Sequence, residues 1–206
     1  MVTYIIIALN VIFSFIGFGD KTFFSRYMFN PYRVHVNKNE WYTLFTHAFL
    51  HADLGHLFFN MFTFYNFGLY LEQQIFPHYF GHHATFLYVI LYVGGIMVSS
   101  IPSFEKQKNN PNYNAVGASG AVSAVIFSFI LIEPNSTLNF FLLPIDIPAS
   151  LFGILYLLIT WYLSKRGGGR IAHDAHLWGS LFGFAFTLIL HPGFFPLFIN
   201  QLISIF

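Results

Sequence analysis

The sequence predicts an all-α membrane protein, a bundle of six transmembrane helices with a long interfacial first loop. Of its 206 residues, 56% are hydrophobic and only 8% are charged, and the mean hydropathy is +0.61. Soluble domains carry about 25% charged residues. Apolar runs able to cross a hydrocarbon core of about 30 Å recur along the chain. The net charge of +1 gives no sign of a nucleic-acid partner.

The first predicted helix spans residues 2–18. It has neither a basic leader nor a small-x-small cleavage site, so we expect a retained membrane anchor. The connection 19–40 mixes lysines and arginines with many phenylalanines and tyrosines. Such mixtures suit the headgroup layer of a bilayer. We therefore expect this loop to lie at the membrane interface.

The other helices are predicted at 55–76, 84–101, 117–133, 147–164 and 172–190. Pro102 is expected to end the third helix, and the Asn-Asn-Pro-Asn sequence at 109–112 is turn chemistry. Lysines, arginines and glycines at 165–170 predict a flexible basic loop. The apolar tail 193–206 is interrupted by Pro196, so we expect it to cap the bundle rather than cross the membrane. No internal repeat or domain boundary is visible, which predicts a single domain over 1–206.

Polar side chains stand at the same end of three predicted helices. The second helix begins with His56 and Asn60, four residues apart and therefore on one face. The fourth begins with Ser119 and the sixth with His176. Six spans would bring these three helices into the membrane from the side of loops 1, 3 and 5. Since polar groups at membrane depth usually mark function, we expect the four side chains to converge.

These four groups suit nucleophilic catalysis. A serine hydroxyl needs a neighbouring base to take its proton, and an imidazole is the usual base. We therefore assign Ser119 as nucleophile and His176 as general base, with His56 and Asn60 as donors that complete an oxyanion hole. Asp174 is two residues from His176 and faces elsewhere on a helix, so the site would be a Ser/His dyad.

Four glycines fit the same geometry. Gly117 permits a tight turn into the fourth helix, and Gly120 removes a side chain where another helix must come close. Gly179 and Gly183 form a Gly-x-x-x-Gly motif that would let the sixth helix approach the fourth. Taken alone, the small residues at 117–120 are equally typical of plain helix packing.

The combination of His51-x-x-x-x-His56-x-x-x-Asn60, Gly117-Ala118-Ser119-Gly120 and Ala175-His176-x-x-Gly179-x-x-x-Gly183 resembles the rhomboid intramembrane serine proteases over roughly the whole chain. The resemblance implies one rhomboid protease domain over 1–206. It implies an enzyme that cleaves transmembrane segments of membrane proteins in the lipid bilayer, with no cofactor and no metal. It also implies a structural role for Glu72, and a gate for substrate formed by the fifth helix and the loop after it.

Two positions depart from the family pattern. Many members have a Trp-Arg pair in loop 1, whereas this chain has Trp41-Tyr42-Thr43. Several members place an aromatic residue one turn after the nucleophile, where it packs on the catalytic histidine. This chain has Ser123 there, which leaves open what supports His176.

The distribution of cations and the family resemblance imply opposite orientations in the membrane. All nine lysines and arginines lie in loops 1, 3 and 5, and cations usually mark the cytoplasmic side. In bacterial members of the family, the resemblance implies that these loops face outward. Following the family, we expect a multi-pass protein of the bacterial inner (plasma) membrane whose site opens to the extracytoplasmic side.

Two alternatives remain. Ten histidines suggest a membrane metalloprotein, because His47 and His51 have a helical spacing suited to a metal ion. No His-Glu-x-x-His motif is present, however. The other alternative is a non-catalytic rhomboid-like protein that binds membrane clients. The chain has no cysteine, which excludes thiol catalysis and disulfides.

Overall fold

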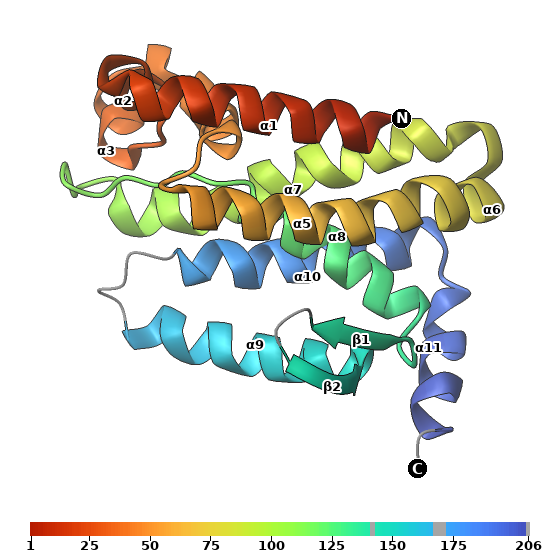
Figure 1. Cartoon of the computed structure of the whole chain (residues 1–206). Coiled ribbons are helices and arrows are strands. Elements are labelled where there is room, and N and C mark those ends of the chain that lie inside the picture. Colours follow the sequence, from red (N-terminus) through yellow and green to blue (C-terminus); the bar gives the residue numbers. More distant parts are fainter. Residues whose placement is uncertain (141–142, 167–171, 205–206) are drawn as a thin grey trace.

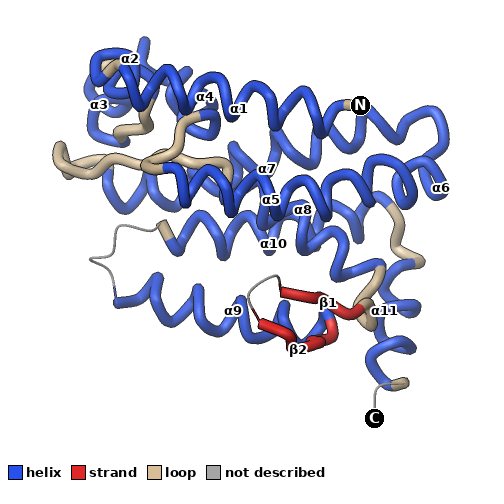
Figure 2. Tube along the Cα trace, in the orientation of Figure 1, coloured by secondary structure: helices blue, strands red, loops and turns tan. Residues whose placement is uncertain are grey.

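The computed structural model describes residues 1–140, 143–166 and 172–204 and is mostly helical (Figures 1 and 2). The longer helices are α1 (Val2–Gly19), α5 (Leu54–Tyr70), α7 (Ala84–Gln107), α8 (Ser119–Ile132), α9 (Ala149–Arg166) and α10 (His173–Leu190). The segment between α1 and α5 contains the short elements α2 (Lys21–Tyr27), α3 (Pro31–Val36), η1 (Lys38–Tyr42), α4 (Thr43–Thr46) and η2 (His47–Phe49). Further short elements are η3 (Leu71–Ile75), α6 (Phe76–Phe80), η4 (Gly81–His83) and α11 (Phe194–Ile203).

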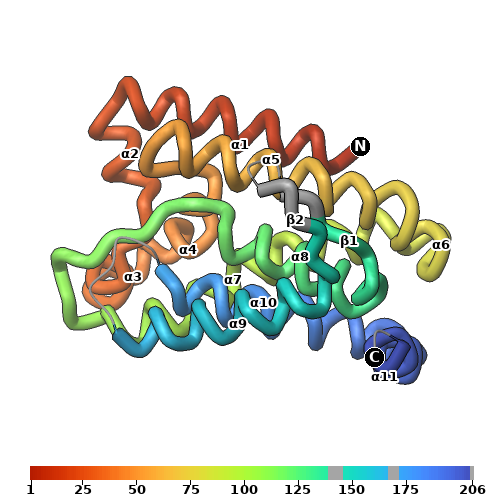
Figure 3. Tube along the Cα trace, turned by 60° about the horizontal axis from the view of Figure 1, so that its bottom comes forward, coloured from red at the N-terminus to blue at the C-terminus, as the bar shows by residue number. Residues whose placement is uncertain are grey.

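Helix α8 lies in the middle of the molecule (Figure 3). It packs against α5, α7 and α10, and every residue from Gly120 to Ile132 is buried. A helix that is apolar on all sides is stable only when it is surrounded. Its 14 residues span about 21 Å, less than the thickness of a hydrocarbon core. The neighbouring helices therefore cover α8 from Gly120 onward, and its first residue, Ser119, is half-buried.

Helices α5 and α7 form a hairpin beside α1. The chain reverses near Gly81, whose φ of +51° suits glycine, and Phe64 of α5 packs on Tyr92 of α7 with ring centroids 4.9 Å apart. The carboxylate of Glu72 accepts hydrogen bonds from the backbone N–H groups of Val2 (2.5 Å) and Thr3 (2.9 Å). It caps the positive end of α1. Glu72 is thus part of the architecture.

Two helical runs among the described residues are long and apolar enough to cross a membrane by length and composition. They are Val2–Gly19 and the 54-residue run Leu54–Gln107, which contains the hairpin of α5 and α7. Helices α10 and α11, bent by 116° relative to each other, make a third if they count as one span. Helices α1 and α9 expose rows of large apolar side chains such as Ile5, Ile12, Leu158 and Ile159. This surface is typical of a membrane protein.

The structure corrects three predictions from the sequence. Pro102 does not end its helix: α7 continues to Gln107, because a proline removes only one backbone hydrogen bond there. The segment after α8 contains an antiparallel hairpin of β1 (Thr137–Phe140) and β2 (Leu143–Pro148), so the chain is not purely helical. Helix α9 consequently begins at Ala149 rather than at 147. Most of the basic loop predicted at 165–170 lies outside the described residues.

The segment between α1 and α5 is fixed to the chain that leads into α8. Phe29 and Ala115 form an antiparallel bridge, in which each N–H donates to the other residue's carbonyl at 3.0 and 2.9 Å. The Asn30 amide donates to the carbonyl of Pro111 (3.0 Å) and to Asn114 Oδ1 (2.9 Å). These bonds hold the approach to Ser119 against the first loop.

Candidate active site

Ser119 is the first residue of α8, and the chain reaches it through a turn at Gly117. Gly117 has a φ of +119°, which residues with a side chain rarely adopt. A Cβ on Gly117 would also lie 2.7 Å from Cε1 of His56. The turn therefore requires glycine for two reasons, and it lies directly against His56.

His56 and Asn60 lie in the first turns of α5. The Asp53 side chain caps this helix by accepting from the His56 backbone N–H at 2.8 Å. Asn60 is buried, and its amide nitrogen donates to the His56 carbonyl at 3.0 Å. One of the two amide N–H groups of Asn60 is thus used within the helix, and the other remains available as a donor.

The ring of His51 packs against the ring of His56. Its ring is fully buried, stands 4.9 Å from the His56 ring at an angle of 74°, and bonds through Nδ1 to Ser14 of α1 at 2.9 Å. Burial, and to a smaller extent the nearby His56, lower the pKa of His51 to about 3. His51 is therefore neutral at pH 7 and links α1 to the site.

His47 holds the turn before Ser119. Its carbonyl accepts from the Gly117 N–H at 3.0 Å, and its Nδ1 lies 2.9 Å from the Thr43 carbonyl, so Nδ1 carries the proton. Its Nε2 faces Ser100 of α7 at 3.5 Å. Burial lowers the pKa of His47 to about 4. His47 and His51 bond to separate partners rather than pointing at a common ion.

Helices α8 and α10 touch through their backbones. A Cβ on Gly179 would collide with the carbonyl of Gly120, and a Cβ on Gly183 would collide with the carbonyl of Ala124. A Cβ on Gly120 would in turn collide with the side chain of Ser99. The four predicted glycines therefore lie at close approaches or turns, and they bring the start of α10 beside the start of α8.

His176 lies in the first turn of α10 and faces α9. Its ring is parallel to that of Tyr156, with centroids 6.1 Å apart and planes 15° apart, and the His173 ring stands 6.0 Å away. The described residues include no hydrogen bond between the Ser119 hydroxyl and the His176 ring. Catalytic hydrogen bonds are often long in free enzymes and shorten only when substrate binds.

Within the described ranges, Asp174 bonds to side chains of α7 and α9, and not to α8, which carries Ser119. Its carboxylate pairs with Lys106 of α7 at 2.8 and 2.9 Å and accepts from the Ser164 hydroxyl of α9. Among the bonds of the described residues, none joins Asp174 to His176, in agreement with its expected direction on the helix. Asp174 ties the ends of α7, α9 and α10 together.

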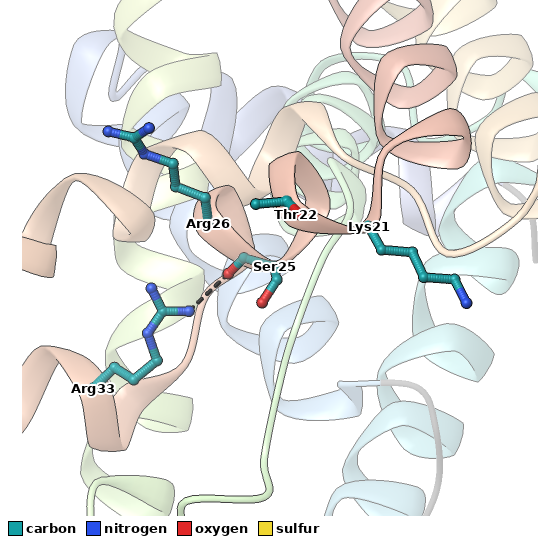
Figure 4. Close-up of a pocket in the computed structure, with 5 residues that line it drawn as sticks. All are labelled: Lys21, Thr22, Ser25, Arg26 and Arg33. Atoms are coloured by element: carbon teal, nitrogen blue, oxygen red, sulfur yellow. Dashed lines mark hydrogen bonds between the residues drawn. The ribbon is translucent and has the colours of Figure 1, made fainter.

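Among the described residues, one hollow borders His176 and another lies over α2. The first, of about 360 Å³, lies between α9 and α10, and Tyr156, Ile159, His173 and His176 are among the residues that line it. The second, of about 550 Å³, lies over α2 and is lined by Lys21, Thr22, Ser25, Arg26 and Arg33 (Figure 4). In the described part of the chain, no three histidines or carboxylates are grouped so that they could hold a metal ion.

Sequence reasoning missed one residue of this site. Tyr156 contacts both His176 and Ser123, yet it is one of 12 tyrosines, and none of them stands out by spacing. The signal that could have pointed to it was Ser123, which stands where the family pattern has an aromatic ring.

Comparison with known proteins agrees with these motifs. The sequence model of the Rhomboid domain matches residues 38–193. The curated protein RHOMBOID-like protein 12, mitochondrial, from Arabidopsis thaliana is 28% identical over 176 residues, which cover 78% of this chain and 50% of that protein. The chain thus spans about half the length of this relative. Neither match supports the expected placement in the bacterial inner membrane, and the name of the relative is that of a mitochondrial protein.

Proposed function

The chain belongs to the rhomboid family, and from this we propose that it is an intramembrane serine endopeptidase. Its substrates would be transmembrane segments of membrane proteins, cleaved by a dyad of Ser119 and His176. One observation carries the proposal. The Gly117 turn that delivers Ser119 lies against His56, while glycine contacts bring the His176 end of α10 against the same end of α8.

In the proposed reaction, the Ser119 hydroxyl attacks the carbonyl carbon of the peptide bond and its proton passes to His176. The carbonyl oxygen becomes an oxyanion, which the Ser119 backbone N–H, His56 and Asn60 stabilise. Each such donor typically contributes about 3–4 kcal/mol in the transition state. The C–N bond then breaks as His176 protonates the leaving nitrogen, which leaves an ester on Ser119. Water deprotonated by His176 hydrolyses this ester and restores both residues.

The substrate must be partly unwound to react. A peptide bond inside a helix has its carbonyl hydrogen-bonded, so Ser119 can reach only a segment that opens. We therefore expect glycine, proline or other small residues near the bond that is cleaved. No metal or cofactor takes part in this scheme.

The proposal includes six membrane passes: α1, α5, α7, α8, α9 and α10. The short, buried α8 would then place Ser119 below the membrane surface, and the segment between α1 and α5 would lie in the headgroup layer. The side that this face occupies can be tested, because the chain has no cysteine of its own. If the face is extracytoplasmic, a Gln107→Cys variant reacts with an impermeant maleimide in intact cells or organelles. If the variant reacts only after permeabilisation, this face lies on the inner side of the membrane.

Covalent labelling with a fluorophosphonate probe tests the chemistry. The wild type should be labelled, and both Ser119→Ala and His176→Ala should abolish labelling and cleavage of a model transmembrane substrate. Ser128→Ala is a matched control, because Ser128 is a buried serine of the same helix that bonds to Thr187 at 2.7 Å, and it should be labelled like the wild type.

A second candidate is a non-catalytic protein that binds membrane clients. The absence of a hydrogen bond between Ser119 and His176 among the described residues agrees with this alternative as well as with a protease that has no substrate bound. This alternative predicts that the well-folded wild type is neither labelled by the probe nor able to cleave a substrate. It also predicts that the wild type and Ser119→Ala bind a transmembrane client equally well.

A further inference from the structure

The base of the proposed dyad is His176, in the first turn of α10. In the described part of the chain, no side chain is hydrogen-bonded to either ring nitrogen of His176. A general base must still be held at the correct angle, because small errors of position slow proton transfer strongly. Some other contact has to orient the imidazole.

The rings of His173 and Tyr156 both lie near His176: the His173 ring stands edge-on to it, and the Tyr156 ring from α9 lies parallel to it. The planes of the Tyr156 and His176 rings are 15° apart and their centroids 6.1 Å apart. This separation is within the range of favourable aromatic contacts, about 4.5–7 Å. A flat surface at this distance limits rotation of the imidazole about its own side-chain bonds.

Tyr156 is itself fixed at its far end. Its hydroxyl is hydrogen-bonded to the Ser123 hydroxyl at 2.8 Å, and the Phe127 ring packs on it with centroids 5.8 Å apart. Ser123 is buried, and it follows Ser119 by one helical turn on α8. The helix that carries the nucleophile thus also anchors the ring that contacts the base.

We propose that Tyr156 is the positioning residue for His176 and that Ser123 is its anchor. This inference rests on the proposed protease function. A tyrosine from α9 would take the place of the aromatic residue that this chain lacks at position 123. Tyr156 touches no reacting atom in this scheme; it acts by fixing the orientation of the base.

Steady-state cleavage and the rate of fluorophosphonate labelling test this role. Tyr156→Leu, which removes the ring, should lower kcat about 30- to 100-fold with little change in KM, and should move the acid limb of the pH profile of kcat. Tyr156→Phe, which keeps the ring, should restore most of the rate and leave a loss of about fivefold. Ser123→Ala should resemble Tyr156→Phe, and the double variant should lose no more than either single variant.

Tyr162→Leu is the matched control. Tyr162 is on the same helix, is exposed and contacts Arg166 rather than His176, so its loss should leave kcat unchanged. If the wild type is labelled at Ser119 but Tyr156→Leu keeps the wild-type kcat and pH profile, the role of Tyr156 is overturned and the proposed protease function stands. A loss of rate that only follows the folded fraction in thermal unfolding would also overturn it. An unlabelled wild type would overturn the proposed function, and the inference with it.

Discussion

The two sides of the candidate site are held by different forces. On the nucleophile side, the turn before Ser119 is tied to the first loop by hydrogen bonds, such as the bond from Gly117 to His47 and the bridge between Phe29 and Ala115. On the base side, His176 is held by glycine packing and by the face of Tyr156. Hydrogen bonds hold a group more rigidly than a ring contact does, so the imidazole of His176 keeps more freedom than the turn before Ser119. Substitutions in the turn before Ser119 should therefore lower stability, whereas loss of the Tyr156 ring on the base side should lower the rate.

On the nucleophile side, Gly117→Ala should have the largest effect on stability. The new Cβ would be strained at a φ of +119° and would lie 2.7 Å from the His56 ring. Strain of about 1–2 kcal/mol and a clash of about 1–3 kcal/mol together predict a loss of about 3 kcal/mol. Thermal unfolding in detergent measures this loss, and fluorophosphonate labelling should vanish.

Gly19→Ala is the control for this substitution. A Cβ on Gly19 would meet nothing within 4 Å, so the midpoint of unfolding should stay where it is in the wild type. If Gly117→Ala were as stable as Gly19→Ala, the turn before Ser119 would not be rigidly held. The contrast between the two sides would then disappear.

Acid should lower the free energy of unfolding, because His47 on the nucleophile side is buried in its neutral form. Its pKa is about 4 in the folded protein and about 6.5 in the unfolded chain, so the unfolded chain binds more protons between these values. The contribution of neutral His47 to stability is complete above pH 6.5 and is lost as the pH falls towards 4. It amounts to about 3 kcal/mol at most.

His47→Gln isolates this contribution. Denaturant unfolding between pH 4.5 and 7.5 should show a shallower dependence on pH in the variant than in the wild type, although the variant is less stable throughout. Part of the dependence remains, because buried His51 has a pKa of about 3. An unchanged slope would show that His47 is not neutral and buried in the native state.

The sequence predicted the parts of this molecule that repeat a simple pattern. Long apolar runs located the main helices, and the joint spacing of His56, Ser119 and His176 identified the candidate dyad. The hairpin after α8 was missed because its short apolar segments lack a clear alternation. Tyr156 was missed because its contact with His176 depends on how α9 packs, and no spacing in the sequence encodes that packing.

The smallest expected effect is that of Lys106→Met, which tests whether an ion pair helps to orient His176. Lys106 pairs with Asp174, two residues before His176, and is half exposed. Exposed ion pairs contribute at most about 1 kcal/mol, so Lys106→Met should lower stability by less than that and should leave kcat unchanged. Lys108→Met is the matched control, because Lys108 pairs with Glu105 away from α10. A tenfold loss of kcat in Lys106→Met alone would mean that the ion pair orients His176 through Asp174, and the base side would then depend on charge as well as on Tyr156.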